Sequence, residues 1–192
     1  MFFEQPMDSL FHALVGAFIG ECAPKSIKNR RLKGALASMS PDLLNIPCYL
    51  YLGFKSNSTL WYPKPEAFYE NPWILDHWTW AGWNLTHSLL FWGIIVMPLI
   101  RRAKWTPLFG AAYLSHLLLD LPSHSGIWSV QPLWPFNWLL QGWFDAWAWN
   151  LQEILMYSTI PAFCWFMMHQ LRSRDWILWP SEREIPILEE AH

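Results

Sequence analysis

Metal-binding side chains stand inside apolar runs of this chain, and no other sequence feature constrains its fold as much. In chain order they are His12 in FHALVGAFIG, Asp42 in SMSPDLL, His87 in NLTHSLL, and His116 with Asp120 in SHLLLDLPSHSG. Burying an imidazole or a carboxylate is costly, or shifts its pKa, unless a partner replaces the lost water. One divalent cation would compensate several such groups together. The sequence therefore predicts a buried metal site.

The spacing of His116 and Asp120 carries the strongest chemical signal. On a helix, residues four apart share a face, so this imidazole and this carboxylate project towards one point. A hydrogen-bonded pair without metal is the open alternative, and Asp42, which follows a proline, is alternatively a helix N-cap. His12 and His87 on other helices favour the metal site. Three imidazoles and two carboxylates suit Zn, with Mn or Fe as alternatives.

The composition favours a membrane setting. The chain is 53% hydrophobic and 15% charged, and it contains 16 Trp, a residue that prefers the membrane–water boundary. A mean hydropathy of +0.11 is low for a protein with several membrane spans, so a soluble helical domain with an aromatic core stays open. A net charge of -2 excludes a nucleic-acid footprint. Three widely spaced cysteines are predicted to be core thiols: Cys22, Cys48 and Cys164.

Apolar periodicity predicts an all-α fold, a helical membrane bundle of about five to six helices in a single domain over 1–192. Two long Trp/Pro-rich loops without lasting helix are expected at 55–83 and 122–143, and 175–192 is expected to be a tail. A helix break is expected at Pro41. The apolar runs are shorter than the roughly 20 residues of an upright membrane helix, so re-entrant helices or a purely interfacial protein stay open.

The basic residues are distributed unevenly. Eleven of the 13 Lys and Arg lie at 25–33, 101–104 and 172–183, and Lys55 and Lys64 are the other two. Lys- and Arg-rich loops mark the cytoplasmic side of membrane proteins. The pattern predicts a multi-pass membrane protein with these segments in the cytoplasm and the metal site towards the opposite face.

Two further residues are candidates on their own account. Glu153 stands in the apolar segment WNLQEILMYS, and a carboxylate inside a membrane helix is a functional candidate, although a buried hydrogen-bond partner for Tyr or Trp is the alternative. His124 follows Asp120 by four residues but lies beyond Pro122. It is therefore a candidate for the shell around the metal ligands.

The order of these motifs resembles the membrane-bound, metal-dependent hydrolases of the YdjM type, over roughly residues 8–136. The matching segments are His12, Pro41-Asp42, Thr86-His87-Ser88, Ser115-His116 with Asp120, Gly126, and Pro132-Leu-Trp-Pro135. The resemblance implies a helical membrane fold and a hydrolytic reaction on a poorly defined substrate. It also implies metal-binding positions at His12, Asp42, His87, His116 and Asp120.

The chain departs from the family pattern in two places. The family often has PD-x-D, but Asp42 is followed by Leu-Leu-Asn, so the second carboxylate is missing. The family also often has His-Arg-Gly just before Thr-His-Ser, and here Gly82 stands where that histidine would be. His77, ten residues before His87, is a candidate replacement outside the direct ligand set.

The predicted function is metal-dependent hydrolysis by a metal-activated water, with Asp120 or Glu153 as the general base. The expected substrate is a phosphodiester or another ester of a lipid-like or small molecule, and the expected partner is membrane lipid. No G-x-S-x-G elbow, Walker loop or G-x-G-x-x-G motif occurs in the sequence, so serine hydrolysis, nucleotide turnover and Rossmann cofactors have no support. The alternative is a membrane metal-ion transporter or a metal-binding protein without hydrolytic activity.

Overall fold

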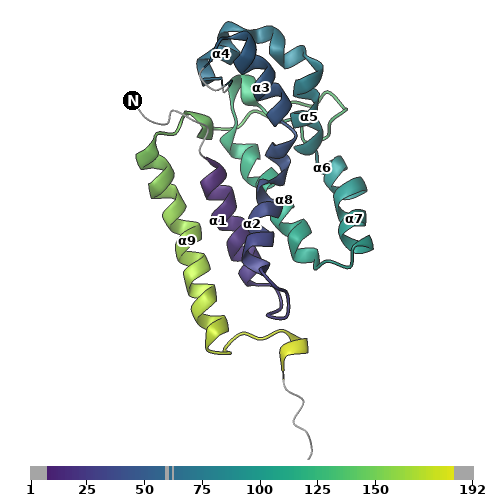
Figure 1. Ribbon diagram of the computed structural model, residues 1–192, viewed down its shortest axis with the longest axis vertical. Coiled ribbons are helices and arrows are strands. Elements are labelled where there is room, and N and C mark those ends of the chain that lie inside the picture. Colours follow the sequence, from purple (N-terminus) through teal and green to yellow (C-terminus); the bar gives the residue numbers. More distant parts are fainter. Residues whose placement is uncertain (1–7, 59–60, 62, 184–192) are drawn as a thin grey trace, which may run out of the picture.

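The computed structural model describes residues 8–58, 61 and 63–183, and these residues form an all-α fold, as predicted (Figure 1). They contain no β-strand, only an isolated antiparallel bridge between Val130 and Leu140. The helices are α1 (Asp8–Glu21), α2 (Arg30–Leu43), α3 (Ile46–Lys55), α4 (Pro65–Glu70), α5 (Trp78–Thr86), α6 (Leu89–Phe91), α7 (Met97–Arg102), α8 (Pro107–Ser123) and α9 (Leu151–Ser173). A π-helical segment, η3 (Trp92–Val96), joins α6 to α7.

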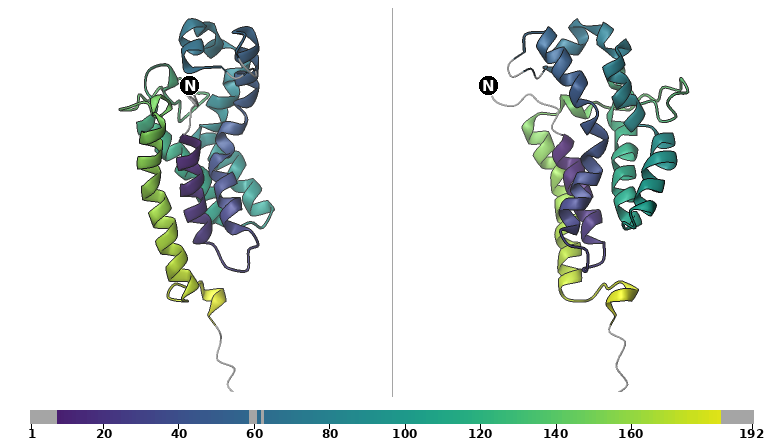
Figure 2. Two further views of the ribbon diagram at one scale, coloured as in Figure 1. Left: turned by 60° about the vertical axis from the view of Figure 1, so that its left-hand side comes forward. Right: turned by 45° about the vertical axis from the view of Figure 1, so that its right-hand side comes forward.

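Helix α1 lies at the centre of the bundle and packs against α2, α8 and α9. Figures 1 and 2 show α9 running beside α1, while α3, α4 and α5 gather at the upper end of the molecule. The turns from α1 to α2 and from α7 to α8, and the end of α9, all lie towards the lower end. The bundle thus separates an upper helical cap from a lower set of connections.

Close contact between α1 and α2 depends on glycine. A Cβ on Gly34 would lie 2.2 Å from the carbonyl oxygen of Gly16, and a Cβ on Gly16 would lie 2.4 Å from the carbonyl oxygen of Gly34. Small residues let two helix backbones approach in this way. The contact brings α1, which carries His12, against α2, which carries Asp42.

The helix break expected at Pro41 is wrong, because α2 continues to Leu43. Proline has no backbone N–H, so it leaves the carbonyl of the residue four positions earlier without its helical donor. That carbonyl belongs to Ala37, and the Ser40 hydroxyl donates to it at 2.7 Å. A serine next to the proline replaces the missing bond, and Asp42 stays on a helix.

The expectation of a loop without lasting helix at 55–83 is also wrong. This segment contains α4, the 3-10 helix η2 (Pro72–Asp76) and most of α5. Prolines stand in the first turns of α4 and η2, where their missing N–H costs nothing and their fixed φ suits a helix. The prolines therefore start helices in this segment, and the helices are shorter and more numerous than the five to six expected.

An aromatic core lies at the upper end, next to the predicted site. The rings of Trp128 and Trp147 lie 4.3 Å apart between centroids, and Phe68 lies 4.5 Å from Trp128. Trp80 and Trp83 belong to the same cluster. The Trp residues here serve as packing. Cys48 joins this core, but Cys164 is exposed on α9, so the core-thiol prediction is wrong for Cys164.

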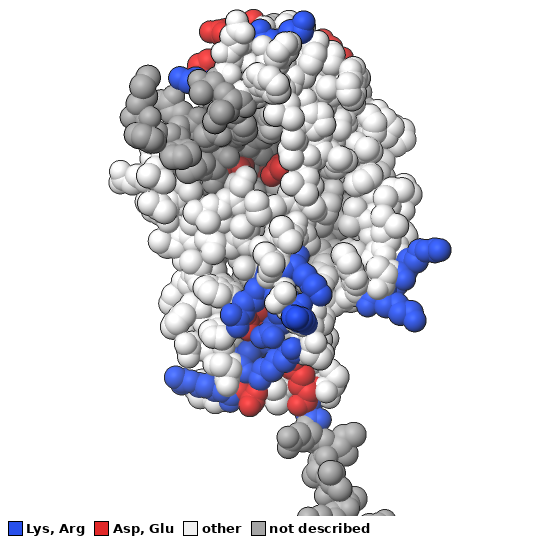
Figure 3. Space-filling model, viewed as in Figure 1, with Lys and Arg blue, Asp and Glu red and all other residues white. Residues whose placement is uncertain are grey.

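Charged side chains collect at the two ends of the bundle. On the face shown in Figure 3, Lys and Arg gather towards the lower end, and a zone of mostly uncharged atoms separates them from the charged groups at the top. Within the described residues, no helix is by itself both long and apolar enough to cross a membrane. Length and composition would allow α5 together with Leu89–Arg102 to do so as a pair bent by 62°.

The segment after α9 packs back onto the bundle as far as η6 (Pro180–Glu182). Arg172 is buried and donates to the Glu182 carboxylate at 2.8 Å and to the carbonyl oxygen of Ala23 at 3.0 Å. Burial raises the pKa of Glu182, but hydrogen bonds from the backbone N–H groups of Lys25 and Trp179, together with Arg172, outweigh it and leave the pKa below its ordinary value. The part of the expected tail at 184–192 lies outside the described residues.

Candidate metal centre

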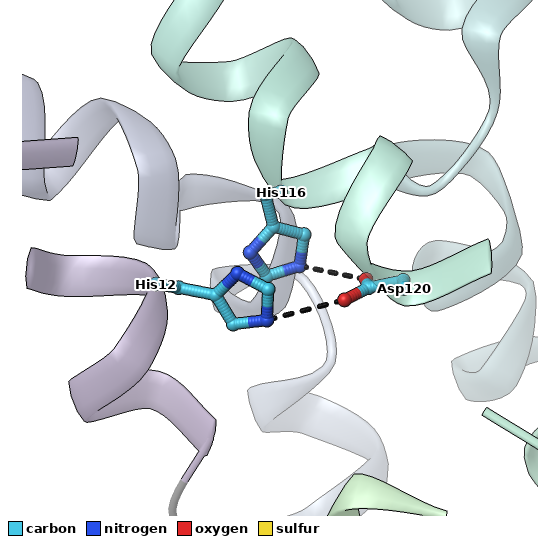
Figure 4. Close-up of side chains that lie close together, drawn as sticks. All are labelled: His12, His116 and Asp120. Carbon is cyan, nitrogen blue, oxygen red and sulfur yellow. Dashed lines mark ion pairs between the residues drawn. The ribbon is translucent and has the colours of Figure 1, made fainter. Parts of the chain in front are cut away.

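Helix α8 supplies the central pair of the site. Asp120 is fully buried, and its Oδ2 lies 3.0 Å from Nε2 of His116, one helical turn earlier. The other oxygen, Oδ1, lies 3.1 Å from Nε2 of His12 on α1 (Figure 4). The His12 and His116 rings lie 3.9 Å apart between centroids. Asp120 therefore joins two helices through its two oxygens.

His87 ends α5 and is oriented by its own helix. Its Nδ1 lies 2.8 Å from the carbonyl oxygen of Trp83, and a carbonyl only accepts, so Nδ1 carries the proton. With its proton on Nδ1, the neutral form of the ring would present the Nε2 lone pair, as a metal ligand must. That Nε2 lies 3.1 Å from Nε2 of His116 and 3.2 Å from Oδ2 of Asp120. The Trp83 ring stacks on His87 at 4.4 Å.

Asp42 closes the group from α2. Its Oδ1 lies 3.5 Å from Nε2 of His87 and 3.6 Å from Nε2 of His116. The Asp42 side chain is 30% exposed, whereas the side chains of His87, His116 and Asp120 are 1% exposed or less. The site is therefore accessible from the side of Asp42.

The donor set fits a cation. Ligands at about 2.0–2.1 Å in a tetrahedron stand roughly 3.3 Å from one another. The five separations given above among Asp42, His87, His116 and Oδ2 of Asp120 run from 3.0 to 3.6 Å. Neither oxygen of Asp120 receives a hydrogen bond from the described residues, although both are buried. A buried carboxylate without donors is rare in proteins, and a cation would satisfy it.

The structure thus brings together all five residues that the sequence singled out as metal ligands: His12, Asp42, His87, His116 and Asp120. It adds His124, whose Nε2 lies 3.6 Å from Oδ1 of Asp120. It also adds Asp8, whose Oδ2 lies 3.8 Å from Nε2 of His12 and 3.9 Å from Nε2 of His124. These seven residues are called the His/Asp cluster below.

Asp8 is not among the residues that the sequence singled out. A signal for it existed, because Asp8 precedes His12 by four residues, as His116 precedes Asp120 and Asp120 precedes His124. Three carboxylate–imidazole pairs thus share the spacing that places side chains on one helix face. The sequence analysis used this spacing for His116 and Asp120 and noted it for His124, but not for Asp8.

Two other candidates have different partners. Glu153 accepts a hydrogen bond from the backbone N–H of Asn150, whose side chain accepts from the Glu153 N–H in return. This capping box starts α9, and we leave Glu153 out of the reaction proposed below. His77 caps α5, accepts from the backbone N–H of Thr79 and stacks on Tyr51 at 4.5 Å. No contact joins Glu153 or His77 to the cluster among the described residues.

The sequence model of the family described as YdjM inner membrane protein matches residues 7–181. This chain belongs to that family. The match extends beyond the segment of 8–136 on which the sequence resemblance rested, and it includes α9 and η6. The description of the family names the inner membrane and no reaction. No curated protein and no solved structure matches the chain.

Proposed function

We propose that this YdjM-family protein is a metal-dependent hydrolase of the membrane. Asp42, His87, His116 and Oδ2 of Asp120, called the first centre below, would hold a divalent cation, Zn in the first place and Mn or Fe as alternatives. The observation that carries the proposal is the tetrahedral spacing of these four donors at 3.0–3.6 Å. When bound, the cation would lower the pKa of a coordinated water towards neutrality, so that the water becomes a nucleophile.

The residues around the first centre divide the remaining tasks. His87 and His116 are held with their Nε2 atoms towards Asp120, and the Trp83 carbonyl fixes the tautomer of His87. Asp42 is the exposed member, and Oδ1 is the atom that faces the imidazoles. Its Oδ2 would accept a proton from an attacking water in this scheme. Asp120 serves as a ligand in this scheme, because each of its oxygens faces imidazole nitrogens.

A lipid-like phosphodiester or other ester is the substrate class that we propose. The support is the family's membrane location and the apolar outer side of α9. Six large residues on this helix are each more than half exposed: Leu151, Leu155, Met156, Ile160, Phe163 and Phe166. Large exposed apolar surface marks contact with a membrane or a partner. A bilayer around the bundle would let a lipid headgroup approach Asp42.

We further propose that the basic end faces the cytoplasm and that the site lies towards the opposite side. Lys and Arg at 25–33, 101–104 and 172–183 lie towards one end of the bundle, as the positive-inside pattern requires. Reporter fusions after Lys104 and after Arg174 should read cytoplasmic, and a fusion within 122–143 should read extracytoplasmic. The reverse result would invert the proposed orientation.

Metal content and turnover together test the function. The full chain, purified in detergent, should retain Zn, and the His87→Ala/His116→Ala variant should lose about one equivalent and roughly 100-fold or more of its phosphodiesterase or esterase rate. His77→Asn is the matched control, because asparagine keeps the helix N-cap and His77 lies outside the cluster. Metal uptake into vesicles without turnover of any ester would favour the transporter instead.

A further inference from the structure

The second oxygen of Asp120 faces its own set of donors. Oδ1 lies 3.1 Å from Nε2 of His12 and 3.6 Å from Nε2 of His124. Oδ2 of Asp8 lies 3.8 and 3.9 Å from the same two nitrogens. Two imidazoles and two carboxylate oxygens therefore surround a second point, on the other side of Asp120 from the first centre. We call Asp8, His12, His124 and Oδ1 of Asp120 the second centre.

The second centre is more enclosed than the first. Asp8 is 5% exposed, His12 and His124 are 2% exposed, and Asp120 is fully buried. Oδ1 of Asp120 receives no hydrogen bond from the described residues, and Nδ1 of His12 and of His124 has no partner among them. Buried polar groups without partners are costly, and carboxylates are the most costly of all. A positive charge among these two carboxylates and two imidazoles would satisfy them.

We infer that the His/Asp cluster binds two divalent cations, with the Asp120 carboxylate as the bridge between them. The second ion is held by the second centre: Asp8, His12, His124 and Oδ1 of Asp120. The inference rests on the proposed function for the first ion. The segment after Asp42 lacks the second carboxylate of the family's PD-x-D pattern. Asp8, on a different helix, supplies a carboxylate in its place.

The two centres differ in access, and this assigns them different tasks. The first centre includes Asp42, whose side chain is 30% exposed, so a water and a substrate can reach it. The second centre has no member above 5% exposure. Enclosed metal sites are structural, whereas catalytic sites keep an open position. The second ion therefore fixes Asp120 and neutralises its charge, and the reaction takes place at the first.

Zinc stoichiometry tests the second centre without any activity measurement. The full chain in detergent is dialysed against Zn²⁺, and bound zinc is counted per chain by mass spectrometry. We expect two equivalents in the wild type and in His77→Asn, and one in Asp8→Asn/His124→Ala. After loading with Mn²⁺, the electron paramagnetic resonance spectrum should show coupled ions in the wild type and an isolated ion in the double variant.

The outcomes separate the second centre from the proposed function. In one outcome the wild type binds one zinc equivalent, which His87→Ala/His116→Ala loses and Asp8→Asn/His124→Ala keeps. That result overturns the second centre and leaves the first intact. A double variant that still holds two equivalents overturns the second centre as well. A wild-type count of zero overturns both. If the double variant does not fold, the wild-type count decides alone.

Discussion

The Thr86 hydroxyl donates a hydrogen bond of 2.7 Å to the carbonyl oxygen of Pro41, 45 positions earlier in the chain. Thr86 directly precedes His87, and Pro41 directly precedes Asp42. One buried bond thus ties together the two chain segments that carry these side chains. The Thr86 carbonyl in turn accepts from the Tyr113 hydroxyl on α8, also at 2.7 Å. Thr86 is therefore a positioning residue for the first centre.

Thr86→Val keeps the shape of the side chain and removes this donor. The Pro41 carbonyl loses its partner, and the angle between α2 and α5 is no longer fixed. We expect zinc affinity to fall by about 10–100-fold, the usual effect of losing a group that orients a ligand. Competition with a chromogenic chelator measures the change. Thr86→Ser keeps the hydroxyl and should bind zinc as the wild type does. Equal affinity in the valine variant would show that the bond has no positioning role.

Gly34→Ala should destabilise the bundle. The added methyl would lie 2.2 Å from the carbonyl oxygen of Gly16, so α1 and α2 must separate. Overpacking of this kind costs about 1–3 kcal/mol, and a lower thermal midpoint in detergent would report it. Gly93→Ala is the matched control, because nothing lies within 4 Å of the added atom. A Gly34→Ala midpoint no lower than that of Gly93→Ala would contradict the close packing of α1 and α2.

Glu182→Gln removes the carboxylate that pairs with buried Arg172. Breaking such a pair leaves a buried charge uncompensated, so we expect a loss of about 3 kcal/mol, or roughly 6–12 °C in thermal midpoint. The pKa of Glu182 is lowered in the folded state from its ordinary value of 4.5. The stabilisation is therefore complete above about pH 4.5 and is lost as the pH falls through the folded-state pKa.

Thermal melts of the wild type and Glu182→Gln should thus differ at pH 7 and converge in acid. Glu70→Gln is the matched control, since Glu70 is exposed on α4. A difference that stays constant from pH 7 into acid would assign the effect of Glu182→Gln to packing instead of charge.

Cys164 tests whether the outer side of α9 faces lipid. It is exposed on the bundle, and a water-soluble reagent would not reach a thiol that lipid covers. In a Cys22→Ser/Cys48→Ala background, a membrane-impermeant maleimide should label Cys164 weakly in intact and in opened vesicles. Labelling should become strong after the protein is unfolded in detergent. Rapid labelling in native vesicles would place this side of α9 in water.

The sequence alone determined the helical class and most of the donor set. Apolar periodicity is a local property, so it can be read from the sequence alone. The spacing of four between His116 and Asp120 places both on one helix face whatever surrounds the helix. His12, Asp42 and His87 stood out because an apolar setting makes a lone polar side chain costly. Proline was the weak point of this reasoning. Pro41 lies inside a helix because Ser40 replaces the missing donor, and Pro65 starts a helix because the first turn needs none.

Only the tertiary structure decided which oxygen of Asp120 faces which imidazole, and that Asp8 and His124 join the site. These relations link α1 to α8 and α2 to α5, and they depend on how closely Gly16 and Gly34 let two helices approach. Only the tertiary structure also showed that the Glu153 carboxylate accepts a hydrogen bond from Asn150 at the start of its own helix. Distances between side chains on different helices are set by packing, which no periodicity in the chain encodes.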